Sequence, residues 1–146
     1  MSITANQFAK FPLSLMNKEA DLNSDTIKCA LFTNAHAPDQ ENDQYYDGAH
    51  GMTEVSAANG YSAGGVAVAN PAIATSGLVT TFDADDPSWT VTGAGFTYRY
   101  AVFYDDTPGS NKPLISFVDF GADVTAVAGT HTILLDSDGI ARITVS

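Results

Sequence analysis

One serine of this chain lies in the pattern that many hydrolases use for nucleophilic catalysis. Residues 60–64 read Gly-Tyr-Ser-Ala-Gly, a literal G-x-S-x-G, and Asp119 and His131 follow in the order that a catalytic triad could use. In α/β-hydrolases a parallel strand enters this pentapeptide and a helix leaves it, which strains the turn and exposes the serine. Here a strand-like segment, 66–69, follows instead. We therefore expect a glycine-rich loop and predict no catalytic residue and no enzymatic activity. The alternative, a hydrolase, would lose its activity in Ser62→Ala.

Aspartates gather at three predicted turns, where they could bind a cation. Calcium needs several oxygen ligands on a short loop, but aspartate is also common in turns because its side chain bonds the nearby backbone. His36 and His50 share a long loop with four acids, without the spacing of a metal site. We interpret these groups as turn and loop residues and predict no metal and no cofactor. The clusters are Asp83, Asp85 and Asp86, then Asp105 and Asp106, then Asp136 and Asp138.

Aromatic side chains could form a platform for a sugar ring. The candidates are Trp89, Tyr98, Tyr100 and Tyr104. Because successive side chains of a strand point to opposite faces, alternating aromatic residues are more often divided between core and surface. Carbohydrate binding is therefore an alternative only. The single cysteine, Cys29, lies in an apolar run and is interpreted as a small buried hydrophobic residue.

The charge of the chain is strongly negative and unevenly distributed. Six basic residues face seventeen acidic ones among 146 residues, a formal net charge of −11. Residues 1–33 hold three basic and three acidic side chains, so the whole excess belongs to the rest of the chain. So few basic side chains provide no cationic face for a phosphate backbone or an anionic membrane. We expect no nucleic acid and no membrane as partner, and we expect partners with a basic face.

The N-terminal residues lack the basic region and the long apolar core of a signal peptide. No apolar run reaches the roughly eighteen residues that a membrane-spanning helix needs. We therefore expect a protein that is made in the cytosol and has no transmembrane helix.

The first 24 residues are predicted to form an arm ahead of the main domain. Phe8, Phe11, Leu15 and Met16 recur at helical spacing and give the segment an apolar face, while Pro12 should begin or kink the helix. Two interpretations stay open: this face covers one end of the domain's own core, or it docks on a neighbouring subunit.

Residues 25–146 are predicted to form a single all-β domain. Short apolar or alternating runs, separated by Gly, Pro, Asn and Asp turns, indicate about seven to eight strands. This pattern is typical of an antiparallel β-sandwich or barrel. A long polar loop, 34–52, offers Tyr45 and Tyr46 for contact, since loops of this length are usually functional or mobile. Two strand pairs are predicted, 97–104 with 114–120, and 130–135 with 140–145 through a tight turn at Asp138-Gly139.

Several phrases of the sequence resemble one known family, in the same order along nearly the whole chain. The most specific phrase is Arg-Tyr-Ala-Val-Phe-Tyr-Asp-Asp at 99–106. The family consists of small all-β virion structural proteins of tailed bacteriophages, of the decoration or cement type, and it supplies no catalytic residue. The other phrases are 25–35, 38–39, 54–55, 60–66, Trp89, 113–121 and 139–140.

The resemblance implies a non-enzymatic virion protein that is assembled in the host cytoplasm. We expect a capsid decoration protein that binds the major capsid protein and forms a homo-oligomer, a dimer or a trimer. Because packaged DNA repels an acidic protein, we expect it on the outside of the head. The alternative is a tail or head–tail connector protein, or a carbohydrate- or receptor-binding module on the virion. Deletion of residues 1–17 is expected to abolish capsid binding and leave the domain folded; the expected contacts are Phe8, Phe11, Leu15, Tyr45 and Tyr46.

Overall fold

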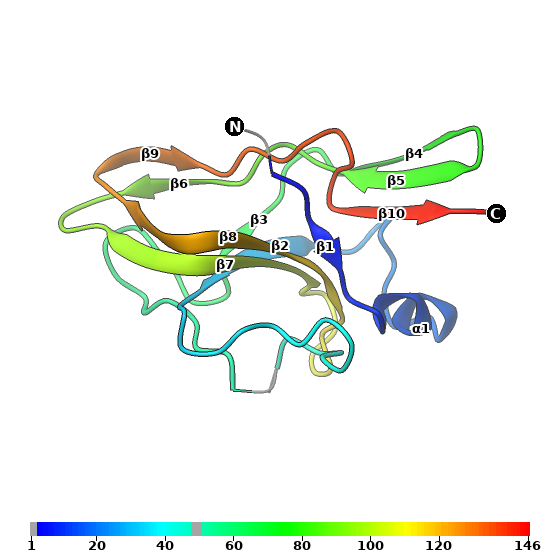
Figure 1. The fold of residues 1–146 in the computed structure, drawn as a ribbon, viewed down its shortest axis with the longest axis horizontal. Coiled ribbons are helices and arrows are strands. Elements are labelled where there is room, and N and C mark those ends of the chain that lie inside the picture. Colours follow the sequence, from blue (N-terminus) through cyan, green and yellow to red (C-terminus); the bar gives the residue numbers. More distant parts are fainter. Residues whose placement is uncertain (1–2, 48–50) are drawn as a thin grey trace.

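The computed structural model describes residues 3–47 and 51–146. In this part of the chain the fold is mostly β, and its antiparallel sheets do not close into a barrel (Figure 1). The largest sheet has the strand order β1-β8-β7-β2-β3. Its strands are β1 (Asn6–Gln7), β2 (Ile27–Phe32), β3 (Val66–Ala67), β7 (Phe96–Asp105) and β8 (Leu114–Ala126). The two smaller sheets are β10-β5-β4, with β4 (Ala72–Ser76), β5 (Val79–Asp83) and β10 (Ala141–Thr144), and β6-β9, with β6 (Ser88–Val91) and β9 (Gly129–Thr132).

The centre of the five-stranded sheet is buried on both faces. Strand β7 pairs with β2 on one side and with β8 on the other. The β7–β8 pairing confirms the predicted pair of residues 97–104 with 114–120. Leu31 and Phe103 belong to one hydrophobic cluster, whereas their neighbours Phe32 and Val102 belong to another. Because side chains alternate along a strand, a run that is apolar at nearly every position requires a cover on each face.

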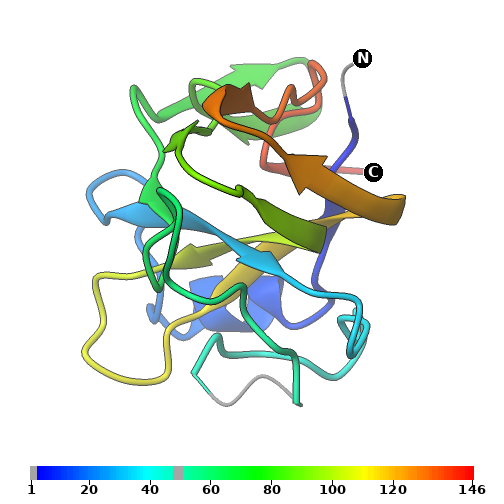
Figure 2. The same cartoon turned by 90° about the vertical axis from the view of Figure 1, so that its left-hand side faces the viewer.

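The first face is covered by the two smaller sheets, which lie side by side over it (Figure 1). After a quarter turn they still lie on the same side of the five-stranded sheet (Figure 2). Phe82 from β5, Trp89 from β6 and Ile133 join the cluster of Leu31 and Phe103 between these layers. The second face is covered by the long loop, whose Tyr46 stacks on Tyr104 with ring centroids 3.9 Å apart.

The predicted C-terminal hairpin is wrong. Strand β9 pairs with β6 and strand β10 pairs with β5, so the turn at residues 136–139 leads from one small sheet to the other. The turn chemistry itself is as expected, since Gly139 has φ +70° and its amide bonds the Asp136 carbonyl at 3.1 Å. A tight turn reverses the chain but does not choose the strand partner. Here separate pairing buries both Ile133 and Ile140 over the large sheet.

The N-terminal segment packs within the fold and does not extend from it as an arm. Strand β1 pairs with β8, and a six-residue helix, α1 (Phe11–Met16), follows with Pro12 in its first turn. Phe8 and Phe11 are each only 1% exposed. They lie in different clusters, because Phe8 packs under the second face of the sheet and Phe11 under the first. Of the two interpretations that the sequence left open, burial in the chain's own core describes these two residues.

Candidate functional site

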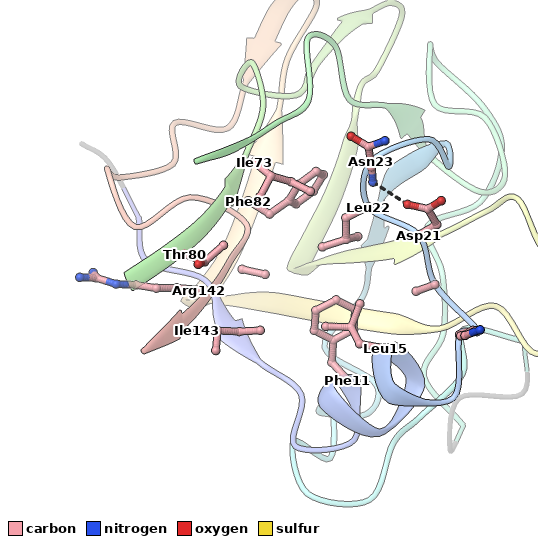
Figure 3. Close-up of a pocket in the computed structure, with 13 residues that line it drawn as sticks. Phe11, Leu15, Asp21, Leu22, Asn23, Ile73, Thr80, Phe82, Arg142 and Ile143 are labelled. Atoms are coloured by element: carbon pink, nitrogen blue, oxygen red, sulfur yellow. Dashed lines mark hydrogen bonds between the residues drawn. The ribbon is translucent and has the colours of Figure 1, made fainter. Parts of the chain in front are cut away.

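A groove separates α1 and the turn after it from the β10-β5-β4 sheet (Figure 3). Its volume is about 510 Å³, within the usual range of ligand pockets. We call it the α1 groove. It is lined by Phe11, Leu15, Lys18, Ala20, Asp21, Leu22, Asn23, Ile73, Thr80, Phe82, Ala141, Arg142 and Ile143.

Strand register builds the sheet wall of the α1 groove. Ile73 pairs with Phe82, and Thr80 pairs with Ile143. Residues that face each other across paired strands point to the same face of the sheet, so these four side chains share one wall. Phe82 is buried at its base, whereas Ile73 and Ile143 remain 47% and 44% exposed at its rim.

A hydrogen-bonded turn fixes the opposite wall of the α1 groove. The helix ends at Met16, and Lys18, with φ +60°, then redirects the chain. The Asp21 carboxylate then accepts hydrogen bonds from the Ser24 hydroxyl at 2.8 Å and the Asn23 amide at 2.9 Å (Figure 3 draws the second). These bonds hold the pKa of Asp21 below its ordinary value. Leu15 and Leu22 are thereby held on a preformed surface.

The lining of the α1 groove suits apolar contact. Its ionisable side chains are Lys18, Asp21 and Arg142, and the described lining contains no histidine, cysteine or serine. Arg142 is an ion-pair partner of Asp138, and its backbone amide donates to Gln7 Oε1 at 3.1 Å. Two of the chain's six basic residues thus lie at this groove. Most of the lining is apolar, so an apolar side chain can enter the groove, and the Asp21 carboxylate is hydrogen-bonded to Ser24 and Asn23.

The predicted contact residues do not form one surface. Phe11 and Leu15 both line the α1 groove, but Phe8 is buried under the other face of the large sheet. The tyrosines belong to the long loop, where the Tyr45 hydroxyl donates to Glu19 at 3.1 Å and the Tyr46 hydroxyl donates to Glu54 at 2.7 Å. In this conformation Phe8 and Phe11 are not exposed anchors, because their own chain covers them.

The glycine-rich pentapeptide has a structural role around Glu54. This carboxylate accepts hydrogen bonds from the Tyr61 hydroxyl and the Gly64 amide, both at 2.6 Å. The Tyr104 hydroxyl donates to the Gly64 carbonyl at 2.7 Å. Burial, together with the bond to Glu54, raises the pKa of Tyr61 far above its ordinary value. These hydrogen bonds tie the loop to β7, and the raised pKa keeps Tyr61 protonated at any physiological pH.

The three candidate triad residues are used separately. Ser62 is exposed, His131 Nε2 lies 2.8 Å from the Tyr98 hydroxyl, and Asp119 accepts a hydrogen bond from Arg99 Nε at 2.7 Å. Burial also lowers the pKa of His131. No hydrogen bond among the described residues joins the serine, the histidine and the aspartate, so the arrangement lacks the contacts of a triad.

The aspartates at the turns bond the backbone and neighbouring side chains. Asp86 accepts the Leu135 amide at 2.9 Å, and Asp106 forms ion pairs with Lys28 and Lys112. In the described ranges no cluster of three or more His, Cys, Asp or Glu side chains could hold a metal ion. His50 lies outside those ranges.

The aromatic residues considered for sugar binding lie in the interior. Trp89 is 5% exposed, and Tyr98, Tyr100 and Tyr104 are likewise buried. Stacking on a sugar requires an exposed ring face, so these four rings form no platform. Their burial follows from the cover on both faces of the large sheet.

The sheet wall of the α1 groove was not predicted from the sequence. Ile73 and Phe82 come from the consecutive strands β4 and β5, whereas Ile143 comes from β10, about sixty residues further along the chain. Of these residues, Phe82 and Ile143 lie in segments that were predicted as strands from their local sequence, and Ile73 does not.

Within the described residues, no helix is long and apolar enough to cross a lipid bilayer. Comparison with protein-family models, with curated proteins and with solved structures finds no match.

Proposed function

We propose that this protein is a non-enzymatic structural component of a bacteriophage virion, a decoration protein that binds the outside of the head. The observation that carries the proposal is the α1 groove, a preformed and largely apolar surface whose described lining contains no histidine, cysteine or serine. The resemblance of the sequence to virion structural proteins points to the same class. The occupant of the groove would be an apolar segment of the major capsid protein.

Charge supports an outward position for most of the molecule. The helical wall of the α1 groove belongs to the neutral residues 1–33, whereas the remaining chain carries the net charge of −11. A strongly acidic body is repelled by packaged DNA and by other acidic bodies. Attachment through the groove would leave that body facing solvent.

The layered sheets support a module that keeps its shape when it binds. We interpret the two small sheets over the five-stranded sheet as a β-sandwich whose second layer is split. The α1 groove then opens at the end of one half-layer, with its floor anchored in the main core through Phe11 and Phe82. A preformed groove loses little conformational entropy on binding.

Binding to isolated heads tests this proposal. Heads of the phage whose genome encodes the chain are stripped of the protein and sedimented with wild type, with Ile143→Asp or with Leu134→Asp. The two substituted side chains are 44% and 43% exposed, and both variants add one negative charge, but only Ile143 lines the groove. We expect Ile143→Asp to lose binding and Leu134→Asp to retain it, with thermal melts to verify folding.

Two outcomes would contradict the proposal. Equal binding by both variants would exclude the α1 groove as the contact. A reconstruction of the virion with this protein in a ring at the tail would favour the alternative, a tail or head–tail connector protein.

A further inference from the structure

Among the strands that the structure describes, β4 is the free edge of the β10-β5-β4 sheet. It pairs there with β5 on one side only, and all five of its residues are exposed. The β4–β5 hairpin lies at one end of the molecule, beside the C-terminal strand (Figure 1). An edge strand presents a row of backbone donors and acceptors that another strand can complete. We propose that β4 pairs with β4 of a second copy of this chain.

The hairpin geometry identifies the backbone groups that would form this contact. The two-residue turn Gly77-Leu78 has φ +59° at Gly77, as a type II′ turn requires, and makes Ser76 and Val79 the hydrogen-bonded pair that closes the hairpin. Hydrogen-bonded and non-hydrogen-bonded pairs then alternate. Thr75 and Thr80 form the next, non-hydrogen-bonded pair, and their hydroxyls lie 3.0 Å apart. The amide and carbonyl groups of Thr75 therefore point away from β5, toward the free edge.

The same alternation fixes a register for two copies. Ile73 also belongs to a non-hydrogen-bonded pair, with Phe82, so its backbone groups point outward like those of Thr75. An antiparallel pair centred on Ala74 places each Ile73 opposite Thr75 of the other copy. In each such pair, Ile73 of one copy and Thr75 of the other exchange two backbone hydrogen bonds. The two-fold axis through Ala74 repeats this pair, so the contact contains it twice. The result is one continuous six-stranded sheet with both α1 grooves on the same face.

The distribution of charge favours a second copy as the occupant. Residues 55–82 contain no charged side chain, although the chain carries a net charge of −11. Natural edge strands are commonly protected by a charged residue, and β4 has none. By contrast, the edge strand β10 contains Arg142, whose amide is already bonded by Gln7. Two acidic copies can approach closely where this uncharged segment faces itself.

Sedimentation equilibrium of the purified protein tests the inference. We expect a monomer–dimer equilibrium whose dimer fraction rises with concentration. Thr75→Pro removes one outward amide from each copy and no backbone hydrogen bond within the chain, although it also removes the hydroxyl contact with Thr80. The dimer dissociation constant should rise at least about tenfold. Thr75→Lys places two like charges near the two-fold axis and should weaken the dimer similarly. The matched control is Thr125→Lys, at an exposed strand threonine of β8 outside the proposed contact.

The inference does not depend on capsid binding and can fail separately from the proposed function. It is overturned if the wild type remains monomeric at all concentrations, if it forms a trimer, or if both Thr75 variants dimerise as well as wild type. Thermal melts distinguish a lost contact from a lost fold, and Thr75→Lys decides the question if Thr75→Pro does not fold.

Discussion

A buried carboxyl group is the least expected ionisable residue of this protein. Asp105 ends β7 with no exposed surface, and its Oδ1 accepts the Thr107 amide at 3.0 Å. Burial, and then the neighbouring Asp25 carboxyl, raise the pKa of Asp105 to about 7. A carboxyl that binds its proton more tightly in the folded state stabilises the protein at acidic pH and loses that contribution as pH rises through its folded pKa.

The first prediction concerns this pH dependence. Between about pH 4 and pH 7 the folded protein holds a proton on Asp105 that the unfolded chain has released. The Asp105 contribution to the free energy of unfolding therefore falls across this window. Asp105→Asn keeps an acceptor for Thr107 without the charge, so we expect it to be more stable than wild type at pH 8 by roughly 1–3 kcal/mol.

Urea unfolding of both proteins at pH 5 and pH 8 measures this difference. A smaller loss of stability at pH 8 is expected for the variant. The same loss in both proteins would assign the pH dependence to other groups.

Gly65 permits a close approach between two backbone segments. It has φ +79°, and a Cβ added to it would lie 1.8 Å from the Cys29 carbonyl oxygen. Gly121 has nearly the same φ, +77°, with open space around it. Gly65→Ala should therefore lower the free energy of unfolding by about 3 kcal/mol or more, and Gly121→Ala by roughly 1–2 kcal/mol. Chemical denaturation compares them; equal losses would show that backbone conformation alone requires glycine at residue 65.

At the scale of elements, the N-terminal helix belongs to the core. Phe11 from α1 packs with Phe82 and other residues beneath the small sheets. From the sequence, deletion of residues 1–17 was expected to leave a folded domain. The structure instead places Phe8, β1 and Phe11 among the stabilising contacts, so that deletion should weaken the fold itself.

Truncation of one side chain tests this role of α1. Phe11→Ala should lower the free energy of unfolding by about 3–5 kcal/mol, the usual cost of a cavity in place of a buried aromatic ring. Leu13→Ala, at a residue of the same helix that is 46% exposed, should cost less than about 1 kcal/mol. Urea unfolding measures both. A negligible loss in Phe11→Ala would mean that the helix is not part of the cooperative core.

Elements with a strong local pattern could be predicted, and their distant partners could not. The apolar run of β2 and the long aromatic strand β7 stand out because both faces are buried. β4 was not predicted because its residues are exposed and, apart from Ile73, small. The predicted pairing of β9 with β10 was wrong because a turn carries no information on the sheet that its strands join. Two of the residues that line the α1 groove, Phe11 and Leu15, were among the predicted contact residues, but the groove itself was not predicted. The other wall depends on cross-strand register, which the sequence does not encode locally.

At the scale of the whole molecule, net charge opposes self-association. Two copies that each carry a charge of −11 repel one another, and salt screens this repulsion over a Debye length of about 10 Å at 0.1 M. The proposed contact through β4 contains no ion pair that salt would weaken.

We therefore expect dimerisation through β4 to become stronger as ionic strength rises. Sedimentation equilibrium at low and high sodium chloride concentrations measures the change. A dimer that weakens in salt would indicate a contact made by opposite charges, away from residues 55–82.

Two separate small sheets cover the large sheet, and this division affects which part of the protein can unfold locally. Strand pairing does not continue between β10-β5-β4, β6-β9 and the five-stranded sheet. The β10-β5-β4 sheet can therefore separate as a local unit while β2, β7 and β8 stay paired. Its amides should exchange with solvent deuterium through this partial opening, whereas the central amides of β7 exchange only when the whole chain unfolds. One wall of the α1 groove thus belongs to a sheet that is expected to open locally while the central strands stay paired.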